Sequence, residues 1–289
     1  MIPSSAMAAT AGSTSDFVLT DAEFNRIREL VREHTGIALS EAKRQLVYGR
    51  LVRRLRALEL RGFGDYIALL EQAHPVELEE FTNAVTTNLT SFFRESHHFD
   101  HLASQVLPAI AQRQAAAGRL RIWSCACSTG EEPYSISIVL REQQALLAGF
   151  DARILATDLD SQVLATAASG VYAAERVQAV SKARVSKYFR QGSGSQQGKV
   201  KVDATLREMV TFKQLNLMQE WPMRGPFDVI FCRNVVIYFD KATQRTLFER
   251  MAALQRPGDI LYLGHSESLY RVSEKYELVG RTIYRRVGV

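Results

Sequence analysis

Residues 122–136, IWSCACSTGEEPYSI, form a pattern typical of a strand that enters a tight turn and continues as a helix. Such turns often bind nucleotides, and phosphate-binding examples favour several glycines and a free helix N-terminus. This turn has one glycine, two cysteines and two adjacent acids, Glu131 and Glu132. The carboxylates would repel a pyrophosphate and attract a cation. The alternative is that they only complement the helix dipole.

The sequence from residue 120 onward alternates between strand-like and helix-like segments. Strand patterns occur in RLRIWS, ARILATDLD, FDVIFCRN and DILYLG, with helical patterns between them and a terminal hairpin in YELVGRTIYRRV. This alternation predicts an α/β domain with a mainly parallel sheet. A glycine- and serine-rich segment interrupts it, so we expect a small antiparallel β insertion at about residues 170–213, supported by Val200, Val202, Val210 and Phe212, with a flexible linker as the alternative.

Residues 17–90 have helical patterns only. Thr20 and Glu23 have the spacing of a capping box, Gly36 ends the first helix, and Pro75 begins the last. A third helix is expected after the GFGDY stretch, residues 62–66. The predicted organisation is a disordered tail at 1–16, a helical N-terminal domain at 17–90 and an α/β domain at 91–289.

Positive charge is concentrated in one predicted helix. The chain of 289 residues has a net charge of +5, and residues 41–61, with seven basic and two acidic residues, have the same local net charge. Either an acidic partner docks there or the arginines form a solvated face.

Several classes of protein are disfavoured. The three cysteines have neither a disulfide nor a zinc spacing, no apolar run approaches a membrane span, and the first residues lack a secretory pattern. We therefore expect a cytoplasmic protein without membrane insertion or a metal site. His97, His98 and His101 are assigned to packing or the surface.

Polar residues follow three predicted strands, where ligands of an open parallel sheet bind. The first group is the acidic turn, the second is Asp158 and Asp160, and the third is Arg233 and Asn234. An acid at the end of the second strand can accept hydrogen bonds from both ribose hydroxyls. A cofactor with adenosine at one end and positive charge at the other fits this pattern, which favours S-adenosylmethionine (SAM).

Five blocks in order resemble the chemotaxis receptor methyltransferases, the CheR family: TNLTSFFRESHHF (87–99), ACSTGEEPYS (126–135), ATDLD (156–160), GPFDVIFCRNVVIYFD (225–240) and GHSES (264–268). The resemblance extends from about residue 17 to the end of the chain. By residue type alone, the first block is also compatible with a capped linker and a core aromatic pair. The resemblance implies a SAM-dependent (Rossmann-like) methyltransferase domain that esterifies glutamate side chains of chemoreceptors, giving S-adenosylhomocysteine (SAH).

The resemblance also implies roles for individual residues. Arg94 and Tyr238 are the expected catalytic pair, although Tyr238 is also compatible with a core aromatic. The expected cofactor-binding residues are Asn88, Thr90, Arg94, Glu132 (with Glu131 beside it), Asp158, Asn216, Leu217, Arg233 and Asn234.

The expected partners are the cytoplasmic helical domain of chemoreceptors, docked on the basic helix, and a short C-terminal receptor peptide at the β insertion, which some family members bind by strand addition. Because a glutamate is already ionised near neutral pH, methyl transfer to it needs no general base. The motifs accordingly contain no obvious histidine–nucleophile pair.

The motifs disfavour three other classes of protein. A nucleic-acid methyltransferase that acts on exocyclic amines commonly has an Asn/Asp-Pro-Pro-aromatic motif, and CRNVVIYF at 232–239 contains no proline. A nicotinamide dehydrogenase needs G-x-G-x-x-G after the first strand, which CACSTGEEP lacks. A non-catalytic receptor-binding module is disfavoured by the intact polar set from Asn88 to Tyr238.

Overall fold

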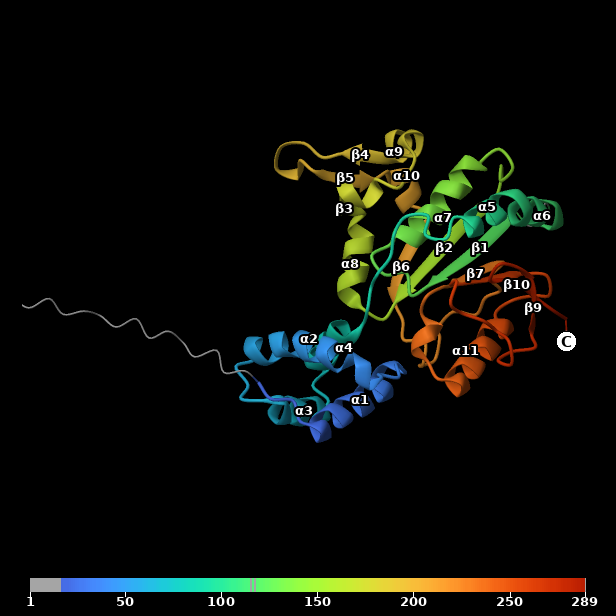
Figure 1. Ribbon diagram of the computed structural model, residues 1–289. Helices are drawn as coiled ribbons and strands as arrows, with labels where there is room; N and C mark the ends of the chain where they lie inside the picture. The colour runs from blue at the N-terminus through green and yellow to red at the C-terminus, as the bar shows by residue number, and fades with distance from the viewer. Residues whose placement is uncertain (1–16, 115, 117, 289) are drawn as a thin grey trace, which may run out of the picture.

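The computed structural model describes residues 17–114, 116 and 118–288, so the expected tail at 1–16 lies outside the described residues. A body of helices is followed by a larger α/β body, and an extended segment joins them (Figure 1). The fold class is the one predicted: a small all-helical N-terminal part, then an α/β part with a mainly parallel sheet and a small antiparallel sheet.

Four helices build the N-terminal body: α1 (Asp21–Thr35), α2 (Arg44–Ala57), α3 (Phe63–Glu71) and α4 (Pro75–Val85). The predicted capping box is present, since the Glu23 amide donates to Thr20 Oγ1 over 3.2 Å and the Thr20 amide to Glu23 Oε2 over 2.8 Å. The expected start of the third helix was too late. Helix α3 begins at Phe63, inside the GFGDY stretch, and its first turn places both Phe63 and Tyr66 in the core.

One buried ionic group holds three of these helices together. Glu77 on α4 is only 4% exposed and accepts hydrogen bonds from Arg54 Nε (3.0 Å) and Nη2 (2.5 Å) on α2 and from the Tyr66 hydroxyl (2.7 Å) on α3. A buried carboxylate requires such partners. Arg54 is therefore engaged within the domain and does not belong to a solvated face of basic residues.

The main sheet has seven strands in the order β6-β2-β1-β7-β8-β10-β9. Strands β6, β2, β1, β7 and β8 are parallel, and the terminal hairpin β9–β10 is antiparallel. The bounds are β1 (Arg119–Cys125), β2 (Asp151–Asp158), β6 (Val210–Gln214), β7 (Val229–Cys232), β8 (Ile260–Leu263), β9 (Tyr276–Gly280) and β10 (Ile283–Arg286). The chain reverses its strand order at β1, which lies between β2 and β7, and a ligand crevice is expected there.

Helices cover both faces of the sheet. Alternate residues of β1 face opposite layers, so Trp123 packs with Leu247 of α11, whereas Ile122 packs with Ile136 of α7 and Leu107 of α6. The helices of this part are α5 (His97–His101), α6 (Leu107–Arg113), α7 (Glu131–Glu142), α8 (Ser161–Ser169), α9 (Lys182–Tyr188), α10 (Ala204–Arg207) and α11 (Lys241–Ala253), with a π-helical turn, η2 (Leu102–Val106), between α5 and α6. Short 3₁₀ turns are η1 (Glu41–Lys43), η3 (Ala174–Val177), η4 (Gly194–Gln196) and η5 (Val236–Tyr238).

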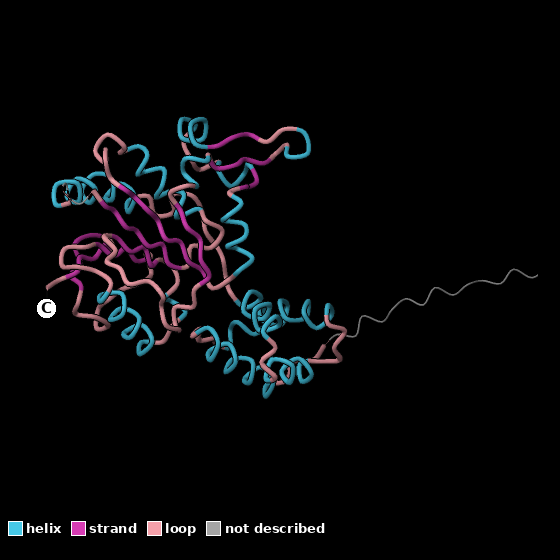
Figure 2. The backbone as a smooth tube through the Cα atoms, turned by 180° about the vertical axis from the view of Figure 1, so that it is seen from behind, coloured by secondary structure: helices cyan, strands magenta, loops and turns pink. Residues whose placement is uncertain are grey.

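The antiparallel insertion is shorter than expected. Its sheet contains β3 (Val171–Ala173), β5 (Lys199–Val202) and β4 (Phe189–Gln191), in that order, and projects from the far end of α8 (Figure 2). Val210 and Phe212, which we had assigned to the insertion, belong instead to β6, the edge strand of the main sheet, where they pair in parallel with Ile154 and Ala156. Their alternation predicts a strand but does not specify which sheet it joins.

Within the described residues, no helix has the length and apolar character required to cross a membrane.

Replacing Glu77 with alanine should destabilise the N-terminal helices by about 3 kcal/mol, because it leaves Arg54 and Tyr66 without their buried acceptor. Urea unfolding followed by circular dichroism measures the loss. The exposed neighbour Glu79→Ala is the matched control and should change stability by less than about 0.5 kcal/mol. Equal stabilities of the two variants would show that the buried group contributes nothing.

Candidate functional site

A pocket opens where the carboxyl ends of β1, β2 and β7 meet, and we call it the central pocket. It encloses about 940 Å³, counting the part open to solvent. Its walls come from the α1–α2 loop, the segment that joins the two bodies, the β1–α7 turn, and the chain after β2, β6 and β7. All ten residues implicated by the sequence line it: Asn88, Thr90, Arg94, Glu132, Asp158, Asn216, Leu217, Arg233, Asn234 and Tyr238.

The single glycine of the β1–α7 turn occupies a position that no other residue can take. Gly130 has φ +96°, and a Cβ there would lie 2.8 Å from Ala167 Cβ and 2.9 Å from the Tyr172 hydroxyl. Only glycine fits that position. Ala126 and Ser128 also have positive φ angles, 52° and 50°, so the turn curls tightly and directs its Ser128 amide at Asp158.

Asp158 forms one end of the pocket. It is 6% exposed; its Oδ2 accepts from the Ser128 amide (2.8 Å) and its Oδ1 from the Asp160 amide (3.0 Å). Burial raises its pKa to about 6, although these backbone hydrogen bonds act in the opposite direction. A carboxylate has about four acceptor positions, so some remain for ligand hydroxyls.

The two adjacent acids of the turn point in different directions, which corrects the expectation that both would attract a cation. Glu132 lines the pocket, accepts from the Ser124 hydroxyl (2.7 Å) and pairs with Arg233 Nη1 (2.9 Å). Glu131 is fully buried and pairs with Arg176 of the β insertion. Neighbouring residues on a helix are about 100° apart, so only one of the two can face the pocket.

A buried arginine joins three segments beside the pocket. Arg233 is 5% exposed, pairs with Glu132 and with Glu95 Oε2 (3.3 Å), and donates through Nη2 to the Arg94 carbonyl (2.5 Å). Burial alone would raise the pKa of Glu95, but Arg233 and His265 together lower it to about 2. Glu95 is therefore an ionised partner of Arg233.

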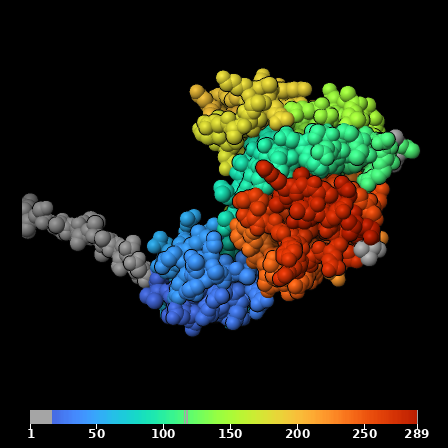
Figure 3. Space-filling view, turned by 45° about the vertical axis from the view of Figure 1, so that its right-hand side comes forward, coloured from blue at the N-terminus to red at the C-terminus, as the bar shows by residue number. Residues whose placement is uncertain are grey.

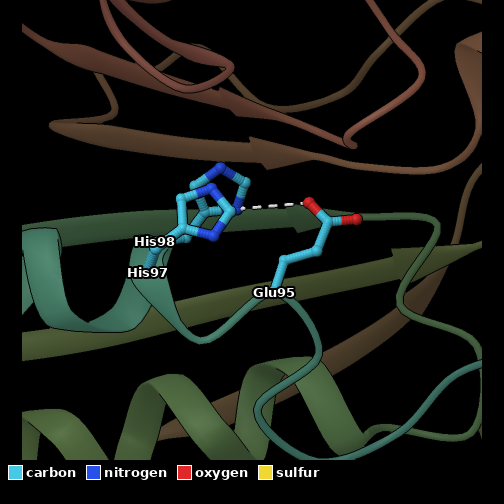
Figure 4. Close-up of side chains that lie close together, drawn as sticks. All are labelled: Glu95, His97 and His98. Atoms are coloured by element: carbon cyan, nitrogen blue, oxygen red, sulfur yellow. Dashed lines mark ion pairs between the residues drawn. The ribbon is translucent and has the colours of Figure 1, made fainter.

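Glu95 also lies beside His97 and His98, as Figure 4 shows, and these three residues could in principle hold a metal ion. The His98 ring has its Nε2 3.1 Å from Thr282 Oγ1, and burial lowers the pKa of His98 to about 3. Arg233 pairs with Glu95, so a divalent cation here would lie close to a guanidinium and be repelled by it. The charges disfavour a metal at this cluster.

The segment that joins the two bodies is fixed to the strand ends by Asp160. Its Oδ2 accepts from Asn88 Nδ2 (2.7 Å) and from the Thr86 hydroxyl (2.9 Å), while its Oδ1 caps α8. The Asn88 carbonyl accepts from the Ser128 hydroxyl (3.0 Å). Asp160 was noted in the sequence without a role, and it holds Asn88 at the pocket wall.

The loop after β7 is held by an acid that sequence reasoning left without a role. Glu267, from the GHSES block, is 5% exposed and accepts from the amides of Asn234 (2.8 Å), Val236 (2.9 Å) and Gly264 (2.6 Å). Asn234 has φ +59°, so the chain turns sharply there before Tyr238. The signal in the sequence was a lone acid in the GHSES block, four residues after the last residue of a buried strand.

Two further lining residues, Thr35 and Ile37, come from the N-terminal body. Neither was predicted, because the sequence contains no motif at residues 35–37 and the contact is between distant parts of the chain.

Family models match nearly the whole chain: "CheR methyltransferase, all-alpha domain" over residues 22–86 and "CheR methyltransferase, SAM binding domain" over 88–285. The chain is 46% identical over 268 residues to a chemotaxis protein methyltransferase of Klebsiella aerogenes, covering 92% of this chain and 90% of that protein. It is 47% identical over 273 residues to chemotaxis protein methyltransferase 2 of Pseudomonas aeruginosa (93% and 94%) and 43% identical over 273 residues to the Escherichia coli enzyme (94% and 93%). With both family domains matched in order and the pocket at the expected strand ends, the chain belongs to the CheR methyltransferase family and is a SAM-dependent methyltransferase.

Proposed function

We propose that this chain transfers a methyl group from SAM to glutamate side chains on the cytoplasmic helical domain of chemoreceptors. The observation that best supports the reaction is that the buried acid Asp158 and the partly buried acid Glu132 line one pocket beside the exposed arginines of α2. The names of the relatives support the receptor as substrate. A cytoplasmic location follows from that choice of substrate.

The residues present suit the cofactor. Asp158 is the acceptor for the ribose hydroxyls, and Glu132 is the acceptor for the ammonium group at the other end. Leu217 provides an apolar surface for the base and is 8% exposed. Thr90, Arg233 and Asn234 complete the wall between the two ends. When bound, the cofactor supplies an electrophilic methyl group on a sulfonium.

The residues of this chain then have to align an ionised carboxylate with that methyl group. Arg94 donates from Nη1 to the Leu89 carbonyl (2.9 Å), so its remaining N–H groups are available to a carboxylate. Among the described residues, none forms a hydrogen bond to the Tyr238 hydroxyl, which can donate to the incoming oxygen. Well-oriented reactants can gain up to roughly 7–11 kcal/mol from alignment of this kind.

Only part of the basic helix is available for docking. Arg50 donates to the carbonyls of Ala84 and Thr86, and Arg54 is engaged with Glu77. Arg53 and Arg56 are exposed and have no ion-pair partner in the described part of the chain. Three residues apart on α2, they lie on one face.

A groove beside α2 connects this charge to the central pocket, and we call it the basic groove. It is lined by Arg50, Arg53 and Arg54 of α2, by Glu80 and residues 83, 84 and 86–89, and by Asp160, Gln162 and Val163. Residues 86–89 line both the groove and the pocket. An acidic receptor helix docked in the groove would bring its glutamates to the pocket entrance.

The β insertion is a second candidate for receptor docking. Strand β4 is at an edge of the small sheet and offers unpaired backbone groups to an extended peptide. A C-terminal receptor peptide added there would tether the substrate without occupying the pocket.

Cofactor affinity should depend on the ionisation of Asp158. Because its pKa is raised to about 6 and ribose hydroxyls donate to the carboxylate, affinity is nearly full at pH 7 and is lost as the pH falls through 6. Calorimetry should give an SAH association constant about tenfold lower at pH 5 than at pH 7. Asp158→Asn should bind more weakly and lack this step; if it shows the wild-type profile, Asp158 does not bind the ribose.

Arg94→Ala should lower methyl transfer to receptor membranes by about 10²–10³-fold, because it removes a charged group that aligns the reactants. Tyr238→Phe should lower turnover by roughly 3- to 10-fold, the value of one neutral hydrogen bond, with SAH affinity nearly unchanged. Initial rates with labelled SAM measure both effects. Near wild-type turnover in Arg94→Ala would exclude its proposed role.

Reversing the two free arginines, Arg53→Glu with Arg56→Glu, should slow receptor methylation about tenfold at low salt and leave SAH affinity intact. The matched control, Arg119→Glu with Arg256→Glu, makes the same charge change at two exposed sites, the first residue of β1 and the loop before β8. Its rate should stay close to that of the wild type. Equal methylation rates for the two double variants across a salt series would show that the arginines of α2 form only a solvated face and do not dock the receptor.

A further inference from the structure

We propose that Leu89 is a substrate-contact residue, whose exposed side chain packs against the receptor helix beside the glutamate that enters the central pocket. This inference rests on the proposed function and deepens it, because it takes the docked partner to be a receptor helix. Leu89 lines both the central pocket and the basic groove. It therefore lies where a helix in the groove would pass the pocket entrance.

Leu89 is an apolar side chain held in solvent. In the described part of the chain, no large apolar side chain is more exposed than that of Leu89, which is 77% exposed. Single exposed apolar residues are common on protein surfaces, so exposure alone does not indicate a contact. Further evidence comes from its place in the segment that joins the two bodies.

Burial alternates along residues 86–92 of that segment. The even-numbered residues are partly or fully buried, whereas Thr87, Leu89 and Ser91 are exposed. Such alternation is typical of an extended chain, whose successive side chains point to opposite sides. Leu89 is thus the one apolar side chain on the outer face of residues 86–92. In Figure 3 this segment, in teal, lies between the blue N-terminal helices and the yellow β insertion.

The backbone around Leu89 is fixed, although it forms neither a helix nor a strand. Its carbonyls at 86, 88, 89 and 90 accept side-chain hydrogen bonds from Arg50 (2.5 Å), the Ser128 hydroxyl (3.0 Å), Arg94 (2.9 Å) and Arg176 (3.2 Å). The donors come from α2, the β1–α7 turn, the segment itself and the β insertion. Because the backbone is already ordered, a partner that covers Leu89 has little conformational entropy to remove.

The surroundings of Leu89 specify the surface of the helix that would meet it. Side chains three or four residues apart lie on one face of a helix. With the methyl-accepting glutamate in the pocket, a residue one turn away would lie over Leu89. Acidic residues further along that face would meet Arg53 in the groove. The favoured substrate is therefore a helix with an apolar side chain one turn from the glutamate and acidic residues beyond it.

The first test measures methylation of receptor-bearing membranes by full-length Leu89→Ala with labelled SAM. The variant loses the apolar contact but keeps the carbonyl that holds Arg94, so the KM for receptors should rise about tenfold while kcat stays within about twofold of the wild type. Leu89→Met, with an apolar side chain of similar volume, should restore most of this loss.

The matched control is Leu278→Ala. Leu278, on β9, is 64% exposed and lines neither the pocket nor the groove, so both kinetic constants should be unchanged. The effect of Leu89→Ala on KM should also be the same at low and high salt, because an apolar contact is not screened. An unchanged KM, equal increases in both alanine variants, or an increase that disappears at high salt would overturn the inference.

The second test is calorimetry with SAH, which separates a receptor contact from a wall of the cofactor site. The SAH affinity of Leu89→Ala should stay within about twofold of the wild type, because the side chain faces solvent. A loss of SAH affinity as large as the increase in KM would overturn the assignment to the receptor. If the wild type transfers no methyl group to receptors, the proposed function fails; if it does and Leu89→Ala matches it, only this inference fails.

Discussion

A buried guanidinium imposes the constraint on which the site depends. Arg233 directly follows β7 and is only 5% exposed. A buried charge of this kind is tolerated only if it is paired. Its partners are Glu132 at the start of α7 and Glu95 in the segment that joins the two bodies. Satisfying one charge therefore fixes the turn, the strand end and the joining segment relative to one another, and Arg94 and Glu132 are brought into one pocket as a result.

The same reasoning explains why the pocket suits a cation that is consumed in the reaction. Burial raises the pKa of Glu132, with Arg233 opposing the shift, and raises the pKa of Asp158 as well. A bound cation would favour the ionised forms of these acids. Attack of a carboxylate on a sulfonium destroys charge, so a poorly solvated pocket favours the transition state over the separated ions. This chemistry needs alignment more than it needs proton transfer.

Strand and helix periods are local, so they predicted the fold class, and the rule that parallel strands end at one edge placed Glu132, Asp158, Arg233 and Asn234 at the pocket. The resemblance to the CheR family supplied the other six predicted lining residues, and it did not extend to Thr35 or Ile37. Pairing between strands and between side chains that are far apart in the sequence was not predictable in the same way. Val210 and Phe212 form a strand whose sheet is decided by its pairing with β2. The partners of Arg54 and Glu131 come from distant segments, as does the contact of Ile37 with the pocket. A one-dimensional pattern contains little information about these contacts.

The central claim is that the product is a glutamate methyl ester on a receptor. The most direct measurement incubates the full chain with methyl-labelled SAM and receptor-bearing membranes, and then exposes the labelled protein to mild base. The account predicts label on the receptor that is released as methanol, since carboxyl esters hydrolyse in base. Label that resists base, label on nucleic acid, or SAM binding with no transfer to receptors would contradict it.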